Sequence, residues 1–466
     1  MSIQFGTDGW RALLDQDFTL ENVAKIVQAF CDLYPKMKEA GRPVIVGYDR
    51  RRLAPEAAET VVSVLLANGI TPIISQGVCT TPCVSWMAVQ KKAAAGIMIT
   101  ASHNPPHWNG LKFKESYGGA ASPGFTGPIE QQIQANDASN KKPKQAEASL
   151  LKKVEFFDPH GAYIEHLKNF VDLEKIKKSK IRVMADPLYG AGAPFWKDLL
   201  GDQVDLIHDK HDMNFGGLHP EPIQPYVNEL METMKRGGYS AGLITDGDAD
   251  RIGAVDEHGN YVTAHEIFAL LLQHVAEHKK WSGTIVKSIS TTRMINRLCK
   301  KYQFPLSVTP IGFKYISPAM NTPGVLMGGE ESGGIGLTRH VCERDGLLCS
   351  LLLLEMMAVR QKKLGELVQT LQKEVGPCFY KRNDLKLPPE AIQKARENLK
   401  KAEPKILCGK KVKEMTAIDG KHFLLEDDSW LLMRPSGTEP LFRTYAEAPN
   451  MPQVEALLAE AKNIVI

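Results

Sequence analysis

The feature that most limits how this chain can fold is a pattern that recurs four times along it. A short apolar run of strand length ends in a loop rich in glycine, hydroxyl or charged side chains. Open α/β sheets hold their ligands just beyond the carboxyl ends of their strands. Four such loops of complementary chemistry therefore predict one shared cleft rather than four separate sites. In chain order the loops are TASHNPP at 100–106, TDGDADR at 245–251, GGEESGG at 328–334 and RPSGTEP at 434–440.

The length and the order of the patterns predict several domains. A chain of 466 residues is too long for one hydrophobic core. Strand and helix patterns alternate, as in doubly wound α/β units, until the character changes after Gly376-Pro377. A polar stretch at 136–149 marks an earlier boundary. We predict three α/β domains and then a smaller one, at residues 1–140, 155–256, 257–375 and 376–466.

The balance of charges argues against a nucleic-acid partner. The chain carries 57 basic and 54 acidic residues, which gives a formal net charge of +3. Such a composition implies no polyanion-binding surface. We therefore expect no nucleic acid among the partners.

Cysteine usage and hydropathy predict a cytoplasmic protein that makes no membrane contact. The eight cysteines are scattered and none forms a Cys-x-x-Cys pair, which is typical of reduced thiols. Asp8, Arg11 and Asp15 stand where a signal peptide would need an apolar core. The most hydrophobic segment, 347–359, is too short to span a bilayer and contains Glu355. We predict a buried helix there.

The loop at 100–106 follows an apolar run at 93–99 that is typical of a buried strand in a parallel sheet. Ser102 and His103 would lie just beyond the carboxyl end of that strand, and the two prolines that follow stiffen the loop. This placement makes Ser102 a candidate hydroxyl nucleophile only in combination with the other loops, because the pair taken alone is a weak signal. Local turn hydrogen bonding also explains a Ser-His pair that stands alone.

Asp246, Asp248 and Asp250 alternate within the second loop. Three carboxylates at this spacing repel one another unless a cation joins them, and an all-oxygen set suits Mg²⁺ or Ca²⁺. An EF-hand is one alternative, because Glu257 falls at the twelfth position, but Arg251 occupies the sixth position, where the turn needs glycine. An aspartyl phosphatase is another alternative, and it would leave Ser102 without a role. We favour a metal site.

The two remaining loops suggest a phosphate site and a sugar site. The loop at 434–440 offers a guanidinium, two hydroxyls and backbone amides, a combination that fits a phosphate dianion. The loop at 328–334 has no positive charge, and its carboxylate and hydroxyl suit the vicinal diols of a sugar. A polar turn at the end of a strand is the simpler alternative for each loop.

Together these loops make the chain resemble the α-D-phosphohexomutases, the family of phosphoglucomutases and phosphomannomutases. The resemblance covers essentially the whole length and rests on the four loops and their order. It implies four domains around a central cleft, the first three doubly wound α/β and the fourth a smaller α+β unit.

The resemblance implies a role for each loop. Ser102 would carry the transferable phosphoryl group, and a phosphate oxygen on it would join Asp246, Asp248 and Asp250 in holding one Mg²⁺. Arg251 would contact the phosphoserine, and Arg11 and Lys112 match the basic residues beside it. The implied substrate-binding residues are Glu330 and Ser332 for sugar hydroxyls, Arg434, Ser436, Gly437 and Thr438 for the distal phosphate, and, by a less sharp match, Lys314 and Arg344.

One position departs from the family pattern. Some relatives end the sugar loop in histidine, whereas this chain has Gly334. A proton-transfer role at that position must therefore move, and Lys112 and His103 are the candidates.

The implied activity is the interconversion of hexose 1-phosphate and hexose 6-phosphate through a phosphoserine enzyme and a bisphosphorylated sugar. We expect glucose phosphate and also mannose phosphate as substrates, and hexose 1,6-bisphosphate as activator. The alternatives are a phosphoglucosamine mutase, a sugar-bisphosphate synthase and a non-catalytic sugar-phosphate-binding homologue. We expect small-molecule sugar phosphates as partners and a monomer or weak homodimer.

Overall fold

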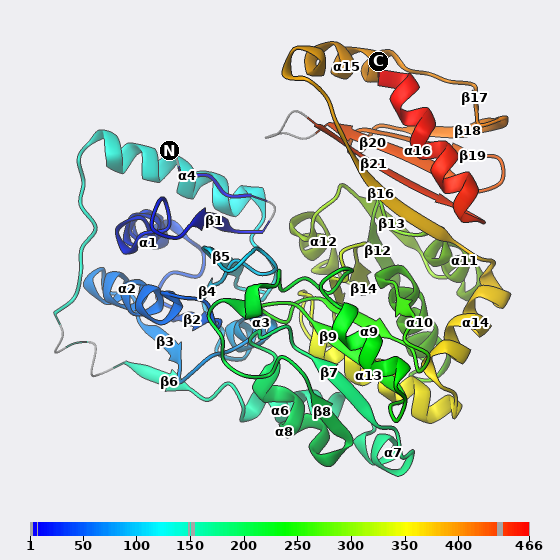
Figure 1. The fold of residues 1–466 in the computed structure, drawn as a ribbon. Coiled ribbons are helices and arrows are strands. Elements are labelled where there is room, and N and C mark those ends of the chain that lie inside the picture. The colour runs from blue at the N-terminus through cyan, green and yellow to red at the C-terminus, as the bar shows by residue number, and fades with distance from the viewer. Residues whose placement is uncertain (1–2, 7, 148–149, 151–153, 436–440, 466) are drawn as a thin grey trace.

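The structure is a computed structural model that describes residues 3–6, 8–147, 150, 154–435 and 441–465. The described chain forms four β-sheets that follow one another along the sequence. In Figure 1 the first sheet lies in the blue part of the ribbon, and the fourth, in orange and red, lies at the top.

The first sheet carries the loop with the predicted nucleophile, Ser102. Its elements are β1 (Trp10–Leu13), α1 (Leu20–Leu33), a 3₁₀ turn (Tyr34–Lys36), β2 (Val44–Tyr48), α2 (Ala54–Ala67), β3 (Pro72–Ser75), α3 (Thr81–Gln90), β4 (Ala95–Ile99), β5 (Trp108–Glu115), α4 (Pro123–Ala138) and β6 (Glu155–Phe157). The strand order is β1-β5-β4-β2-β3-β6. β2, β3, β4 and β6 are parallel, and β5 pairs antiparallel with both of its neighbours, β4 and β1. Successive side chains of β2 point to opposite faces. Val44 and Val46 therefore join the core under α1 and α2, and Ile45 joins the core under α3.

The second sheet carries the aspartate loop. Its elements are α6 (Ala162–Phe170), α7 (Leu173–Lys178), β7 (Val183–Asp186), α8 (Ala193–Leu200), β8 (Val204–Leu206), α9 (Asn228–Lys235), β9 (Ala241–Thr245), β10 (Ile252–Val255) and β11 (Tyr261–Val262). The strand order is β11-β10-β9-β7-β8. β9 lies in the middle of the sheet, and all of its residues are buried.

The third sheet carries the loop predicted to bind sugar. Its elements are α10 (Ala264–Glu277), β12 (Thr284–Ser288), α11 (Arg293–Tyr302), β13 (Leu306–Thr309), α12 (Phe313–Met320), β14 (Val325–Gly329), β15 (Ile335–Leu337), α13 (Gly346–Arg360) and α14 (Leu364–Val375). The strand order is β13-β12-β14-β15, with only β15 antiparallel.

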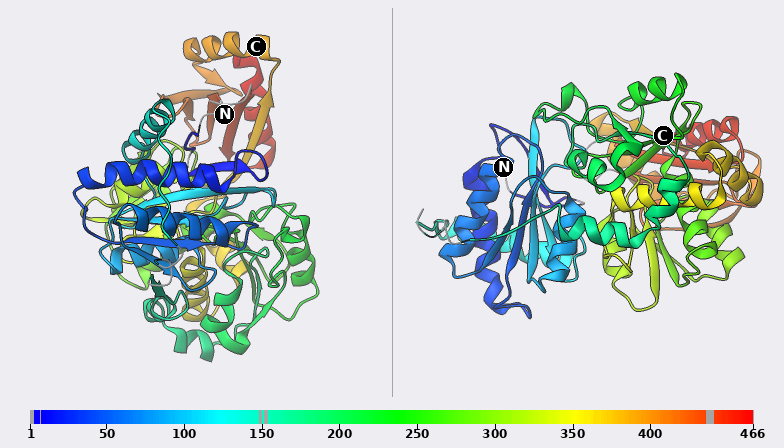
Figure 2. Two further views of the ribbon diagram at one scale, coloured as in Figure 1. Left: turned by 90° about the vertical axis from the view of Figure 1, so that its left-hand side faces the viewer. Right: turned by 90° about the horizontal axis from the view of Figure 1, so that it is seen from below.

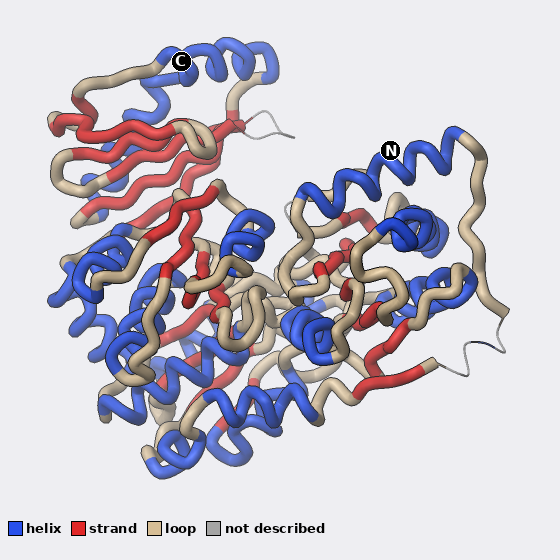
Figure 3. Tube along the Cα trace, turned by 180° about the vertical axis from the view of Figure 1, so that it is seen from behind, coloured by secondary structure: helices blue, strands red, loops and turns tan. Residues whose placement is uncertain are grey.

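The fourth sheet differs in kind from the other three. Its elements are β16 (Phe379–Lys386), α15 (Pro389–Lys401), β17 (Ile406–Leu407), β18 (Lys410–Thr416), β19 (Lys421–Leu425), β20 (Trp430–Pro435), β21 (Leu441–Ala448) and α16 (Met451–Val465). Every pairing in the sheet is antiparallel. Figure 3 shows its strands, in red, with helices to one side. The predicted combination of three α/β units and one α+β unit is confirmed.

One apolar core joins the first three sheets, since Ile45, Trp196 and Leu351 belong to a single buried cluster. The fourth sheet has its own core with α15 and α16. It meets the third sheet through a small cluster in which Ile289 packs with Trp430. The first three units therefore form one packed body, and both views of Figure 2 show the fourth attached at its side.

Local patterns predicted the key elements correctly. The apolar runs before the four loops are β4, β9, β14 and β20, and the helix predicted over 347–359 is α13, most of which is buried. All eight cysteines lie within the described residues and are free thiols. Among the helices that the structure describes, none has both the length and the apolar character required to cross a bilayer.

Candidate active site

Ser102 lies in the loop that follows β4. Its backbone N–H donates to Thr100 Oγ1 over 2.8 Å, and its φ of 53° is in the left-handed region. The Ser102 hydroxyl donates to Asp246 Oδ2 over 2.9 Å. The loop after β4 of the first sheet thus places the predicted nucleophile against the aspartate loop of the second.

The three aspartates of that second loop form one buried cluster. Asp246, Asp248 and Asp250 have no exposed surface, and each offers an oxygen within 4.8 Å of the others. Burial and the two neighbouring carboxylates raise the pKa of Asp246 well above its usual range. Oδ1 of Asp248 and Oδ1 of Asp250 accept no hydrogen bond from any described residue. Buried carboxylate oxygens left without donors fit a hard divalent cation, so these residues could hold a metal ion.

Lys112, on β5, balances part of this negative charge. Its ammonium lies 2.8 Å from Asp248 Oδ2, 2.9 Å from Asp250 Oδ2 and 2.8 Å from Asp8 Oδ2. Burial lowers the pKa of Lys112, but the three carboxylates outweigh burial and hold it above its usual value. The side chain is therefore a fixed positive charge at neutral pH. Asp8 lies just before β1, and no role was predicted for it.

Arg344 connects the carboxylate cluster to the predicted sugar loop. Its guanidinium donates to Asp250 Oδ2 over 2.6 Å, to Asp8, and to Glu330 Oε1 over 3.3 Å. A Cβ atom at Gly334 would lie only 2.2 Å from Arg344 Cδ. The glycine that departs from the family pattern therefore makes room for Arg344.

The sugar loop is ordered by its own polar groups. The Ser332 hydroxyl donates to Glu330 Oε1 over 2.8 Å. Burial raises the pKa of Glu330, and the charge of Glu331 adds to this effect. Glu330 and Ser332 both line the cavity described below.

His103, Arg251 and Arg11 belong to, or contact, the two loops that carry Ser102 and the aspartates. Arg251 donates through its backbone N–H to Asp246 Oδ1 over 3.0 Å and through Nη1 to Glu221 over 3.4 Å. Arg11 donates to Asn104 Oδ1 over 2.7 Å. Burial lowers the pKa of His103 well below its usual value, and the charges of Arg251 and Arg11 lower it further. His103 is thus a neutral imidazole at neutral pH.

The loops that carry His103, Arg251 and Glu330 line one cavity of about 720 Å³. Its walls draw on all four sheet-containing segments, and three of the four predicted loops contribute residues to it. The fourth loop, at 434–440, lies mostly outside the described residues. Six predicted residues line it: Arg11, His103, Arg251, Glu330, Ser332 and Arg344. Sequence reasoning missed other wall residues, among them Asp8, Glu221, Tyr380, Arg382 and Tyr445. Asp8 could have been predicted from the sequence, because it is a charged residue between Gly6 and Gly9. The residues around the other four give no local sign of a site.

Lys314 and Arg434 lie close together beside this cavity. Arg434 Nε donates to Asp419 Oδ1 over 2.7 Å, and Lys314 Nζ donates to the Gly6 carbonyl over 3.5 Å. Burial and then the charge of Arg434 lower the pKa of Lys314. Two neighbouring cations suit a phosphate. The other predicted phosphate ligands, Ser436, Gly437 and Thr438, lie outside the described residues.

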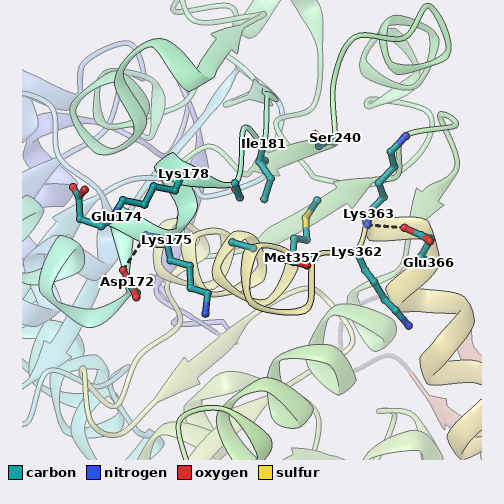
Figure 4. Close-up of a pocket in the computed structure, with 13 residues that line it drawn as sticks. Asp172, Glu174, Lys175, Lys178, Ile181, Ser240, Met357, Lys362, Lys363 and Glu366 are labelled. Atoms are coloured by element: carbon teal, nitrogen blue, oxygen red, sulfur yellow. Dashed lines mark hydrogen bonds between the residues drawn. The ribbon is translucent and has the colours of Figure 1, made fainter.

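A second cavity, of about 890 Å³, lies away from this site between α7, α13 and the start of α14 (Figure 4). Lys175, Lys178, Lys362 and Lys363 line it. Its carboxylates include two that accept backbone hydrogen bonds near helix starts, drawn as dashed lines. Its buried lining residues are apolar, so it contains no counterpart of the buried polar groups around Ser102.

Comparison with known proteins agrees with this geometry. Four family descriptions match in succession: Phosphoglucomutase/phosphomannomutase, alpha/beta/alpha domain I at residues 2–140, domain II at 161–259, domain III at 263–375, and the C-terminal domain at 381–464.

Individual relatives match over nearly the whole chain. The phosphoglucomutase/phosphomannomutase of Thermococcus kodakarensis is 32% identical over 450 residues, which cover 95% of this chain and 94% of that protein. The phosphoglucosamine mutase of Bacillus cereus is 30% identical over 479 residues, covering 100% and 98%. Among solved structures, a Thermus thermophilus protein assigned as a phosphomannomutase has 30% identity and a TM-score of 0.86, covering 100% and 99%. The chain therefore belongs to the phosphoglucomutase/phosphomannomutase family.

Proposed function

We propose that this protein is a hexose phosphomutase that interconverts hexose 1-phosphate and hexose 6-phosphate, with glucose and also mannose phosphates as substrates. One observation carries the proposal. The Ser102 hydroxyl is hydrogen-bonded to a buried cluster of three carboxylates that could hold a metal ion. This cluster lies beside a cavity lined by candidate sugar-binding residues. A nucleophile, a cation site and a polar cavity together are what phosphoryl transfer to a sugar requires.

In the proposed reaction, phosphorylated Ser102 gives its phosphoryl group to the free hydroxyl of the bound sugar phosphate. The bond from phosphorus to the Ser102 oxygen breaks and a bond to the sugar oxygen forms. The proton of the sugar hydroxyl passes to a base, and the Ser102 oxygen takes up a proton, which it gives up again when it is rephosphorylated. The sugar is then bisphosphorylated. It turns over in the cavity and returns its other phosphate to Ser102, and the proton returns to the departing sugar oxygen.

Charge neutralisation is the main task of the residues around Ser102. The phosphoserine and the substrate each carry nearly two negative charges, which repel each other. Asp246, Asp248 and Asp250, with an oxygen of phosphorylated Ser102, would hold one Mg²⁺, which when bound offsets this charge. Lys112, Arg11 and Arg251 supply further positive charge from fixed positions. A positive charge needed at a fixed position accounts for the burial of Lys112 against carboxylates.

Proton transfer falls to His103 in this proposal. Lys112 is held in its charged form by three carboxylates, so it cannot accept a proton near neutral pH. The His103 imidazole is neutral, and its Nδ1 is buried without a hydrogen-bond partner among the described residues. A neutral imidazole at the cavity wall suits general base catalysis.

Substrate binding is divided between two ends of the cavity. Glu330 and Ser332 would bind the 3- and 4-hydroxyls, whose positions are roughly exchanged when the sugar turns over. Arg434 and Lys314 would hold the phosphate that is not reacting, together with Ser436, Gly437 and Thr438. Hexose 1,6-bisphosphate, the intermediate itself, would act as activator because it phosphorylates Ser102.

A phosphoglucosamine mutase is the second candidate, because a relative with that name is 30% identical over the full chain, against 32% for the relative named for glucose and mannose. We further propose a cytoplasmic enzyme that acts as a monomer or weak homodimer.

The test is an assay of purified protein with Mg²⁺, a trace of glucose 1,6-bisphosphate, and either glucose 1-phosphate or glucosamine 1-phosphate. We expect glucose 6-phosphate to form faster. Faster turnover of the glucosamine compound would establish the second candidate. Accumulation of the bisphosphate would indicate a sugar-bisphosphate synthase, and binding without turnover would indicate a non-catalytic homologue.

A further inference from the structure

Arg51 is a buried arginine beneath the nucleophile loop. It follows β2 and is only 1% exposed, whereas the next residue, Arg52, pairs with Asp15 at the surface. A charge buried this completely needs both a counter-ion and hydrogen-bond acceptors. The hydrogen-bond acceptors of Arg51 show which part of the chain it holds in place.

The Arg51 guanidinium donates to four backbone carbonyls of one loop. Nη2 donates to Ser102 O over 2.6 Å and to Asn104 O over 2.7 Å. Nη1 donates to Pro105 O and Trp108 O, each over 3.0 Å. The four carbonyls span the turn that carries the nucleophile, so one side chain fixes the path of the whole loop.

Asp49 and Thr100 complete the support. Asp49 Oδ2 lies 3.3 Å from Arg51 Nε and accepts a 2.6 Å hydrogen bond from the Thr100 hydroxyl. Thr100 Oγ1 in turn accepts the backbone N–H of Ser102 over 2.8 Å. The peptide groups on both sides of Ser102 are thus tied to one buried ion pair.

The backbone of Ser102 requires such support. Its φ of 53° lies in a region that residues with a side chain rarely occupy and that persists only where the surroundings hold it. The opposite side of the loop is also closed, because a Cβ atom at Gly247 would lie 2.3 Å from Ser102 O. The aspartate loop therefore packs directly on the carbonyl that Arg51 holds.

We infer that Arg51, supported by Asp49 and Thr100, is the positioning residue of the nucleophile: it holds loop 100–106 so that the Ser102 hydroxyl stays directed at the carboxylate cluster. The inference rests on the proposed phosphomutase function. Only arginine fits this role, because its planar fork of five donors reaches several carbonyls at once, whereas a lysine ammonium is a point charge with three donors.

The primary test is Arg51→Lys, with Arg52→Lys as the matched control at the neighbouring position. Arg51→Lys keeps the charge opposite Asp49 but loses the fork. We expect kcat to fall about 10²-fold, since a displacement of roughly 1 Å in a reacting group costs this much. KM for glucose 1-phosphate should stay within about twofold, because the residue touches no substrate. Arg52→Lys should leave both constants unchanged.

A second pair of variants tests the same support in case Arg51→Lys does not fold. Thr100→Val removes the acceptor for the Ser102 N–H and should lower kcat, and Thr100→Ser should restore it. The rate at which glucose 1,6-bisphosphate phosphorylates Ser102, followed by mass spectrometry, should change in parallel with kcat.

The inference would be overturned if the folded Arg51→Lys protein had the wild-type kcat and the wild-type rate of Ser102 phosphorylation. If Tm alone were lower, Arg51 would have a purely structural role. If the wild-type protein itself has no mutase turnover, the proposed function fails instead.

Discussion

Ser102 and Asp246 stand 144 positions apart in the sequence, yet the Ser102 hydroxyl donates a 2.9 Å hydrogen bond to Asp246 Oδ2. β4 delivers the first residue and β9 the second, each at the carboxyl end of a strand in a different sheet. The contact extends to the backbone, where Thr81 N–H donates to Asp248 O over 3.0 Å. Ser102 and the carboxylates are thus positioned by direct packing of the first unit on the second.

Replacing the hydroxyl should end the chemistry. Ser102→Ala should lower turnover of glucose 1-phosphate, with added bisphosphate, by more than about 10³-fold, because the substitution removes the proposed phosphoryl carrier. Substrate binding and Tm should stay close to wild type. Ser139→Ala, at the exposed end of α4, is the control and should be fully active. A Ser102→Ala protein that keeps more than about a tenth of the wild-type rate would exclude Ser102 as the nucleophile.

Activity should require Mg²⁺, and Asp248→Asn should weaken Mg²⁺ binding by at least about tenfold, because it removes one of three negative charges from the cluster. Titration calorimetry measures the affinity, and an assay after exhaustive chelation measures the requirement. Asp202→Asn, at an exposed position, should change neither. Full activity without a divalent cation would contradict the metal site.

Arg434→Ala should raise KM for glucose 1-phosphate roughly 10- to 100-fold, since a hydrogen bond to a charged group contributes about 1.5–3 kcal/mol. Arg434 is proposed to hold only the phosphate that is not reacting, so kcat should change far less. Steady-state kinetics of Arg434→Ala and of the exposed control Arg236→Ala would measure both constants. An unchanged KM would place the distal phosphate elsewhere.

Both glucose 1-phosphate and mannose 1-phosphate should be substrates, with glucose preferred. Turning the sugar over preserves contacts from Glu330 and Ser332 to the 3- and 4-hydroxyls, but it moves the 2-hydroxyl, where the two sugars differ. The ratio of the two kcat/KM values should therefore stay below about 10⁴, the discrimination that a dedicated hydrogen-bond reader reaches. A larger ratio would reveal a residue that reads the 2-hydroxyl.

Glu355 should stabilise the contact between the second and third units in a pH-dependent manner. It accepts hydrogen bonds from Lys279 Nζ and from the Asp172 N–H, and lies 2.7 Å from His274 Nε2. Burial alone would raise its pKa, but hydrogen bonds with His274 and Lys279 lower it from 4.5 to about 2. The folded-state pKa lies below the unfolded value, so this stabilisation is complete above about pH 4.5 and is lost as the pH falls toward 2.

Glu355→Gln should therefore lower Tm by roughly 5 °C at pH 7, as expected for breaking a buried ion pair. The difference from wild type should be clearly smaller at pH 3, which lies within the range where the stabilisation is lost. Thermal scans at the two pH values measure both effects. Glu232→Gln, which affects only the exposed pair with Lys235, should change Tm little at either pH. An equal Tm difference at both pH values would show that the charge of Glu355 does not stabilise the fold.

The elements of the fold could largely be predicted from the sequence, because the signals are local. The apolar run before Ser102 is β4, and the apolar segment around Glu355 is α13, since side-chain periodicity and length depend only on neighbouring residues. The antiparallel edges of the first three sheets were not predicted. Strand direction there depends on pairing between segments, which no local pattern encodes.

The sequence by itself determined which chemical groups the chain possesses: the serine, the three alternating aspartates and the order of the four loops. Tertiary structure alone decided how these groups meet. Asp8 bridges Lys112 and Arg344, Arg51 holds the loop of Ser102, and Gly334 leaves space for Arg344. Each of these contacts joins segments far apart in the chain, and its geometry depends on how separate sheets pack. Short-range preferences specify the elements, whereas burial of a shared core brings distant charges within hydrogen-bond distance.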